Sequence, residues 1–296
     1  MTMWSQIKTN FKQGSYLTRL LYINLGMFVL VRLVLLIFTL FKHDISFAIR
    51  YIEMPAYIGN WITQPWGIIT YMFLHVDFIH FIFNVLVLYW YGTIFLQFFN
   101  QKQLVGVYIL GGIGGAFLYV FGYSVFPYFQ EVLKHTYLLG ASASVMALIF
   151  TTVIYAPNYE VQLALIGRVK LKYIGLVLFA VDVLGVTSVN AGGSIAHIGG
   201  AITGILFASL YVRQRVDLTT GISWLLDKLA TLVQPKPKIT VSYGRPKTDA
   251  EWNVEKKAKN AALDEILEQI KKSGYENLSA EQKKMLFDIS NKKNNN

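Results

Sequence analysis

A serine stands near the start of an apolar run, 138–155, where small residues flank it. Ser142 is a candidate nucleophile, but a serine hydroxyl becomes reactive only with a base within hydrogen-bond reach. Five histidines are available, and only His80 and His197 lie inside other apolar segments. His197 is followed by glycines whose spacing allows two helices to approach almost backbone to backbone. The residues therefore favour nucleophilic catalysis by Ser142, with His197 as its general base.

Two alternatives stand beside this interpretation of Ser142. A serine in a membrane helix is commonly a small residue at a helix contact and nothing more. Ser144 is a rival hydroxyl, but it lies two residues along and therefore about 200° around the helix, so it cannot share the face of Ser142. We expect Ser144 to serve packing.

The composition is that of a membrane protein. Apolar residues make up 54% of the 296 residues and charged residues 15%, which is more apolar than an ordinary soluble domain. A spanning helix needs about 20 mostly apolar residues, so we expect six crossings, at 21–41, 79–99, 103–126, 138–155, 171–188 and 194–212. The expected fold is an all-α polytopic membrane protein. Its parts are a cytoplasmic N-terminus (1–20), a six-helix membrane domain (21–213), an amphipathic segment and linker (214–255) and a cytoplasmic helical hairpin (256–296).

Three motifs give the chain a family resemblance. They are Gly140-Ala141-Ser142, the pattern A-H-x-G-G-x-x-x-G that begins at Ala196, and His75-x4-His80-x3-Asn84. With these motifs in this order, residues 60–213 resemble the rhomboid intramembrane serine proteases. The resemblance implies a six-helix rhomboid-like bundle and a Ser142–His197 dyad that hydrolyses a peptide bond in or near the outer end of a substrate's transmembrane helix. The alternative is a proteolytically inactive relative that only binds transmembrane helices. An unrelated transporter is disfavoured because the sequence shows no internal repeat.

His80 and Asn84 lie four residues apart and therefore share one face of their helix. One interpretation is structural, because buried polar residues in a bundle commonly hydrogen-bond each other or a neighbouring helix. The other is that both point at the space beside Ser142 and stabilise the oxygen that becomes negative in the tetrahedral intermediate. We adopt the oxyanion-stabilising role as our prediction.

The chain departs from the family pattern at three positions. Gly67 stands where an arginine usually follows Trp66, Ala143 where a glycine usually follows the nucleophile, and Gln97 where an acidic residue usually ends the second span. The change at Gly67 affects a structural or lipid-facing contact and no catalytic group. Alanine is the mildest change available at a crowded contact.

Arg32 and Asp182 lie inside expected spans, where each costs on the order of 2.5–3.5 kcal/mol and is by default a functional candidate. Arg32 is expected to extend its long side chain toward the basic cytoplasmic end of its helix. Asp182 lies near the external end of the fifth span. It either orients His197 as a third catalytic residue or pairs with water or backbone at the helix end, and both interpretations stay open.

The distribution of basic residues predicts the orientation in the membrane. Lys and Arg gather before the first span, between the fourth and fifth, and after the sixth, so both termini are expected to be cytoplasmic. Ser142 and His197 then lie near the same external face. We expect a multi-pass protein of a bacterial inner (cytoplasmic) membrane.

The tail contains two recognisable helical patterns. Residues 222–233 form an amphipathic stripe suited to a membrane surface, and Ser279 with Gln282 predicts a capping box at the start of a final helix.

Cysteine is absent, which excludes a thiol nucleophile and a zinc–thiolate site. We expect no metal and no cofactor. The expected partners are single-span transmembrane substrates and membrane lipid, and no nucleic acid, because no basic stripe or reading motif is present.

Overall fold

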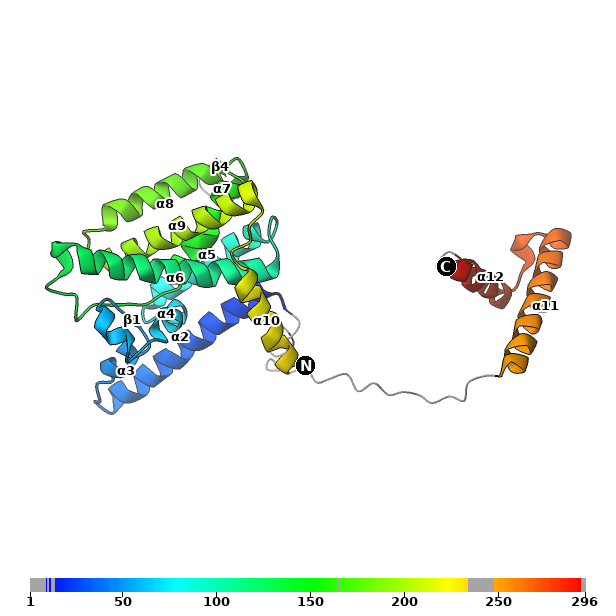
Figure 1. The fold of residues 1–296 in the computed structure, drawn as a ribbon, viewed down its shortest axis with the longest axis horizontal. Coiled ribbons are helices and arrows are strands. Elements are labelled where there is room, and N and C mark those ends of the chain that lie inside the picture. The colour runs from blue at the N-terminus through cyan, green and yellow to red at the C-terminus, as the bar shows by residue number, and fades with distance from the viewer. Residues whose placement is uncertain (1–8, 10, 12–13, 164–165, 234–247, 294–296) are drawn as a thin grey trace. The chain divides into compact units, whose positions relative to one another are not determined.

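The computed structural model describes residues 9, 11, 14–163, 166–233 and 248–293, in two compact units that divide at Gln234 (Figure 1). The first unit carries the three motifs. Its helices are α2 (Tyr16–Leu40), α3 (Ser46–Arg50), α4 (Gly67–Thr70), α5 (Phe78–Phe95), α6 (Gln101–Val125), α7 (Ser142–Tyr155), α8 (Leu171–Gly185), α9 (Ala191–Gln214) and α10 (Thr220–Val233). Single 3-10 turns lie at Ile58–Trp61, Tyr71–Phe73 and Pro127–Phe129.

Among the described residues, four helices are long and apolar enough to cross a membrane: α2, α5, α6 and α9. Two further helices, α7 and α8, occupy the expected fourth and fifth spans but have only 14 and 15 residues. The chain is thus mostly helical with several candidate spans, as a multi-pass protein requires.

The fourth expected helix begins later than its apolar composition predicted. Residues 137–138 form the short strand β2 and not a helix; it pairs antiparallel with β1 (Met54–Pro55) in the loop before α4. Gly140 then turns the chain with φ +123°, a conformation that side-chain-bearing residues rarely adopt. As a result Ser142 is the first residue of α7.

Helices α6, α7 and α9 form a close-packed trio. An added Cβ at Gly200 or Gly204 of α9 would collide with the carbonyl oxygen of Ala143 or Ala147 in α7. These two contacts confirm the close approach predicted from the glycine spacing. Because the residue numbers increase together from the first contact to the second in both helices, α7 and α9 run parallel and begin at the same end.

Helix α8 is attached more loosely and lies at the edge of the bundle opposite α2 (Figure 1). A hairpin, β3 (Glu160–Leu163) paired with β4 (Gly167–Lys170), leads into it. Only Leu171, Gly175 and Asp182 of α8 are buried, and their spacing defines one narrow face. Helix α8 therefore contacts the bundle along a single stripe.

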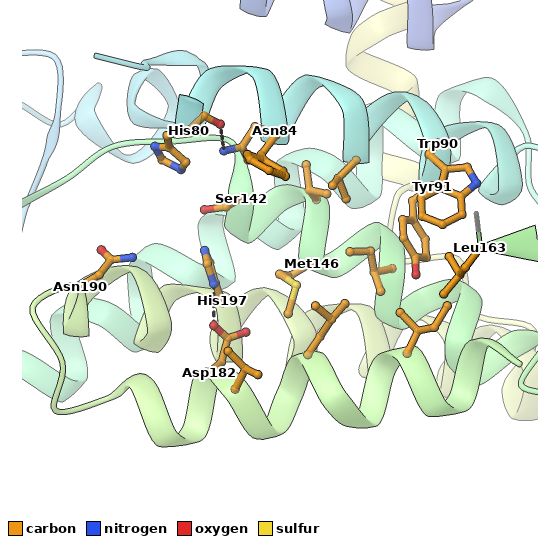
Figure 2. Close-up of a pocket in the computed structure, with 17 residues that line it drawn as sticks. His80, Asn84, Trp90, Tyr91, Ser142, Met146, Leu163, Asp182, Asn190 and His197 are labelled. Atoms are coloured by element: carbon orange, nitrogen blue, oxygen red, sulfur yellow. Dashed lines mark hydrogen bonds and ion pairs between the residues drawn. The ribbon is translucent and has the colours of Figure 1, made fainter. Parts of the chain in front are cut away.

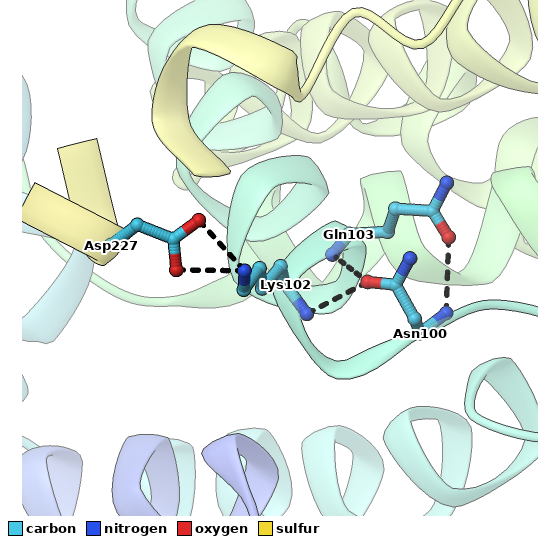
Figure 3. Close-up of polar contacts among 4 residues, drawn as sticks. All are labelled: Asn100, Lys102, Gln103 and Asp227. Carbon is cyan, nitrogen blue, oxygen red and sulfur yellow. Dashed lines mark hydrogen bonds and ion pairs between the residues drawn. The ribbon is translucent and has the colours of Figure 1, made fainter. Parts of the chain in front are cut away.

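Helix α10 belongs to the first unit because polar contacts attach it to the start of α6. Asn100 and Gln103 form a capping box at the beginning of α6, and Lys102 pairs with Asp227 of α10 at 2.7 Å (Figure 3). Gln103 also donates a hydrogen bond of 2.9 Å to Asp217, just before α10.

The second unit contains α11 (Asp249–Ser273), a 3-10 turn (Tyr275–Asn277) and α12 (Ala280–Lys293). Helix α11 begins seven residues before the expected position 256, because Thr248 and Glu251 form a capping box. The predicted box of Ser279 and Gln282 is confirmed, with both reciprocal hydrogen bonds present.

The prediction for Arg32 was wrong in direction. Its guanidinium donates a 3.3 Å hydrogen bond to the carbonyl of Val76, in the loop just before α5. That loop adjoins His80, so Arg32 extends toward the end of the bundle that carries the candidate site. The carbonyl of Val76 offers a closer acceptor than the other end of α2, from which Arg32 is separated by several turns.

Candidate active site

His197 lies between Asp182 and Ser142, as Figure 2 shows. Its Nδ1 is 2.7 Å from Oδ1 of Asp182, and the opposite edge of the ring points toward the Ser142 hydroxyl. For this contact to be a hydrogen bond to a carboxylate, which can only accept, Nδ1 must carry the ring proton, and Nε2 then faces Ser142 with its lone pair. No hydrogen bond joins Ser142 to the ring in the described structure; such catalytic contacts often tighten only when substrate binds.

The helix register explains why Ser142 and His197 meet. Gly200 packs on Ala143, so the turn of α9 that precedes Gly200 lies beside the start of α7. His197 occupies that turn, three residues before Gly200, and Ser142 immediately precedes Ala143. The glycine contacts therefore place the candidate nucleophile and base at the same end of two parallel helices.

The turn that carries Ser142 is held by the loop before α5. Gly140 donates its N–H to the carbonyl of Tyr71 at 2.9 Å, and Ala141 donates to Nε2 of His75 at 3.4 Å. His75 is fully buried, and burial, together with nearby His80, lowers its pKa to about 4. His75 is therefore neutral at physiological pH and can accept this hydrogen bond.

His80 and Asn84 both face the space beside Ser142 (Figure 2). Asp77 caps the start of α5 by accepting the N–H of His80 at 2.7 Å. Asn84 donates from Nδ2 to the backbone carbonyl of His80 at 3.0 Å, so the two side chains do not bond each other. A Cβ on Gly140 would lie 2.9 Å from the His80 ring and 3.7 Å from Oγ of Ser142, which shows how closely the ring adjoins the serine.

Two cavities meet at the candidate dyad. The larger, about 480 Å³, runs between α5 and α8 and is lined mainly by apolar side chains, among them Trp90, Met146 and Leu178. The smaller, about 240 Å³, lies toward β2 and the start of α9 and carries Thr136, Tyr137 and backbone from the glycines at 192 and 193. His80, Ser142, Asn190 and His197 line both cavities. The site thus has one apolar and one more polar approach.

The remaining expected residues have structural explanations. Ser144 is fully buried against α6, on the other side of α7 from the site. The methyl group of Ala143 faces Gly115, which leaves room for it. Gly67 lies against the carbonyl of Glu53, where any side chain would crowd the backbone at 2.7 Å. Gln97 accepts a hydrogen bond from Tyr159 at 2.9 Å and so links α5 to the turn after α7.

Sequence reasoning did not place two residues in the site. His75 was named only as the first residue of a motif, and its role in holding the turn before Ser142 depends on a contact 66 residues away. Asn190, in the loop before α9, points into the site (Figure 2). A polar amide immediately before the helix that carries His197 was the available signal.

Comparison with known proteins covers most of the chain. Residues 63–214 match the family described as Rhomboid domain, and residues 247–292 match a family of unknown function, DUF6576. The chain is 29% identical over 144 residues to RHOMBOID-like protein 12, mitochondrial, of Arabidopsis thaliana. That alignment covers 45% of this chain and 43% of the relative, so the two proteins share less than half of their lengths.

Proposed function

Because the chain belongs to the rhomboid family, we propose that it is an intramembrane serine endopeptidase with Ser142 as nucleophile and His197 as general base. The observation that carries this proposal is the placement of the Ser142 hydroxyl opposite the edge of the His197 ring that faces away from Asp182, beside a cavity between two helices. The other reading, a relative that only binds transmembrane helices, does not need a serine and a histidine arranged in this way.

The proposed reaction follows from these positions. His197 Nε2 takes the proton of Ser142 as Oγ attacks a peptide carbonyl, and the resulting tetrahedral oxyanion forms beside His80 and Asn84. His197 then gives the proton to the leaving amine, the peptide bond breaks, and an acyl-enzyme remains on Ser142. A water deprotonated by His197 hydrolyses this ester and restores the serine.

The oxyanion is stabilised by donors from two sides. Ser142 is the first residue of α7, so its own N–H has no acceptor within the helix. His80 and Asn84 contribute side-chain donors from α5; Asn84 has a second amide hydrogen beyond the one bound to the His80 carbonyl. These donors strengthen as negative charge develops in the transition state.

The two cavities suit the two reactants of a hydrolysis. A substrate helix that enters between α5 and α8 meets apolar side chains, and water reaches the acyl-enzyme from the polar side near Asn190. A helical substrate hides its carbonyls in intrahelical hydrogen bonds, so it must unwind locally. The expected substrates are single-span proteins with small or helix-breaking residues near the outer end of the span.

We also propose the membrane arrangement expected from the sequence. Helices α7 and α8 complete a six-span bundle with the four long helices, both termini are cytoplasmic, and Ser142 lies toward the external face. The bacterial inner membrane remains our proposed location. The Arabidopsis relative is named as mitochondrial, and that name describes the relative.

A labelling experiment tests the proposed function. Purified protein in detergent is treated with a fluorophosphonate probe, and cleavage of a single-span test substrate is followed in parallel. We expect labelling and cleavage by wild type, loss of both in Ser142→Ala and loss of cleavage in His197→Ala. Ser144→Ala, which removes the buried rival hydroxyl, should keep both activities. Labelling that persists in Ser142→Ala contradicts the nucleophile, and a folded wild type that neither labels nor cleaves supports the inactive relative.

A further inference from the structure

Asp182 is buried inside the bundle, on a helix whose other residues from 174 to 185 are all apolar. Its side chain is 10% exposed, whereas Leu176, Val181 and Leu184 of the same helix are largely exposed. A carboxylate in a membrane helix is costly, on the order of 2.5–3.5 kcal/mol by insertion scales. Asp182 shares the narrow inward stripe of α8 with Leu171 and Gly175, so it is directed at α9 and not at lipid. The charge must therefore be stabilised by what it meets there.

What Asp182 meets is the candidate base. Its Oδ1 is 2.7 Å from Nδ1 of His197, within the short range typical of charge-assisted hydrogen bonds. In Figure 2 this contact lies on the side of the ring opposite Ser142. Among the described residues, the other titratable side chain beside His197 is His80 from α5, which lines the same cavity. Asp182 is the acidic side chain that lines this cavity.

We propose that Asp182 is a third, positioning member of the site, which fixes the tautomer and orientation of His197 and stabilises its protonated form during catalysis. This inference rests on the proposed protease function and changes its dyad into a Ser142–His197–Asp182 triad. Asp182 does not touch the substrate or move a proton itself. It keeps the Nδ1 proton in place so that Nε2 faces Ser142 with a free lone pair.

The test compares two substitutions at Asp182 with a matched control on α8. Asp182→Asn keeps the shape and removes the charge, Asp182→Glu keeps the charge, and Leu184→Ala alters an 81% exposed side chain of the same helix. The measurements are kcat and KM for a single-span test substrate across pH, together with thermal unfolding in detergent. Leu184→Ala should match wild type throughout.

We expect Asp182→Asn to lower kcat by about 10²-fold or more with little change in KM, since an orienting carboxylate in serine proteases is worth up to about 10⁴. The acid limb of its kcat/KM profile should move to lower pH, because loss of the anion destabilises the His197 cation. Asp182→Glu should recover part of kcat and restore the acid limb. A purely structural role would lower the unfolding temperature without moving the limb.

The outcomes separate this inference from the function on which it rests. If wild type shows Ser142-dependent cleavage but Asp182→Asn stays within about threefold of it with an unmoved acid limb, the triad is overturned and the dyad stands. If wild type shows no Ser142-dependent cleavage, the protease itself is overturned. Nitrogen-15 NMR of the wild-type histidines is a second test that does not depend on whether any variant folds. A neutral His197 ring protonated at Nδ1 supports the triad, and one protonated at Nε2 overturns it.

Discussion

The trio α6, α7 and α9 and the neighbouring helix α8 hold opposite sides of one site, but they are packed very differently. In α7 every residue from Ala143 to Val153 is buried, whereas α8 buries three residues along one stripe. Glycines bring the trio's backbones into contact, and α8 presents large apolar side chains outward. The proposed nucleophile and base thus belong to a closely packed frame, and Asp182, which contacts the proposed base, belongs to a helix with few packing contacts.

This difference indicates which part of the site has a fixed geometry and which part can move. Interiors packed to this density do not deform continuously, so the distance between Ser142 and His197 is set by folding. Helix α8 borders the apolar cavity, and its displacement costs less packing. We expect changes in the trio to affect folding first and changes on the flanking helices to affect catalysis first.

The largest effect should come from Gly200→Ala. An added methyl would meet the backbone of Ala143, which cannot move aside without displacing α7. Overpacking of this kind lowers the free energy of unfolding by about 1–3 kcal/mol, and by more when the added group meets backbone atoms. We expect a clear fall in the unfolding temperature in detergent and loss of cleavage.

Gly26→Ala is the matched control for Gly200→Ala. A Cβ at Gly26 of α2 has no neighbour within 4 Å, and alanine is favoured over glycine in a helix by about 1 kcal/mol. Its unfolding temperature should equal or exceed that of wild type. Equal unfolding temperatures for both variants would show that the trio is not closely packed.

A smaller loss, confined to turnover, is expected from Asn84→Ala on α5. Removal of one oxyanion donor typically lowers kcat by about 10²–10³-fold, and KM should hardly change because the interaction forms in the transition state. Thr93→Ala serves as control, because it removes a hydroxyl on the same helix that donates to the carbonyl of Tyr89. If Asn84→Ala lowers the unfolding temperature and leaves kcat unchanged, the residue is structural.

Glu53 in the loop before α4 predicts a modest pH dependence of stability. Burial raises its pKa from 4.5 to about 7, although nearby Arg50 opposes the shift. Because the folded state then binds this proton more tightly than the unfolded state, its contribution to stability is lost as pH rises through 4.5 to about 7. The unfolding temperature of Glu53→Gln should therefore rise relative to that of wild type as pH increases from 4.5 to about 7. An unchanged difference across this range contradicts the assignment.

The smallest effect is expected from removal of the second unit. A protein that ends at Gln234 keeps α10 and its contacts with Lys102 and Gln103, so cleavage of a generic substrate should equal that of the full chain. A protein that ends at Val216 loses those contacts and should unfold at a lower temperature. Equal stability of the two shortened proteins would show that α10 contributes nothing to the bundle.

The sequence predicted the structure best where a candidate catalytic residue lies beside regularly spaced small residues. The glycines after His197 predicted its close approach to the helix of Ser142, because small residues at four-residue intervals have few other roles. Apolar composition did not reveal that residues 137–138 are extended, since a strand against protein and a helix in lipid both need apolar side chains. Arg32 was misjudged because its acceptor, Val76, lies in a distant part of the chain.

Asp182 shows the remaining limit of sequence reasoning. Its place near the outer end of a span was consistent with either a partner for His197 or a solvated helix end. Only the burial of its side chain and the rotation of α8 distinguish the two. Helix rotation depends on packing against α9, and the hydrophobic pattern of α8 is too uniform to define it.

The shortness of α7 fixes a depth for the proposed chemistry. Its 14 residues rise about 21 Å, which is about 9 Å less than a hydrocarbon core of about 30 Å. In the proposed arrangement, with the inner end of α7 at the cytoplasmic boundary, Ser142 would be recessed below the outer surface by roughly two helical turns. The proposed protease would then select the bond it cuts by the distance of that bond from the membrane surface, as well as by the residues on either side of it.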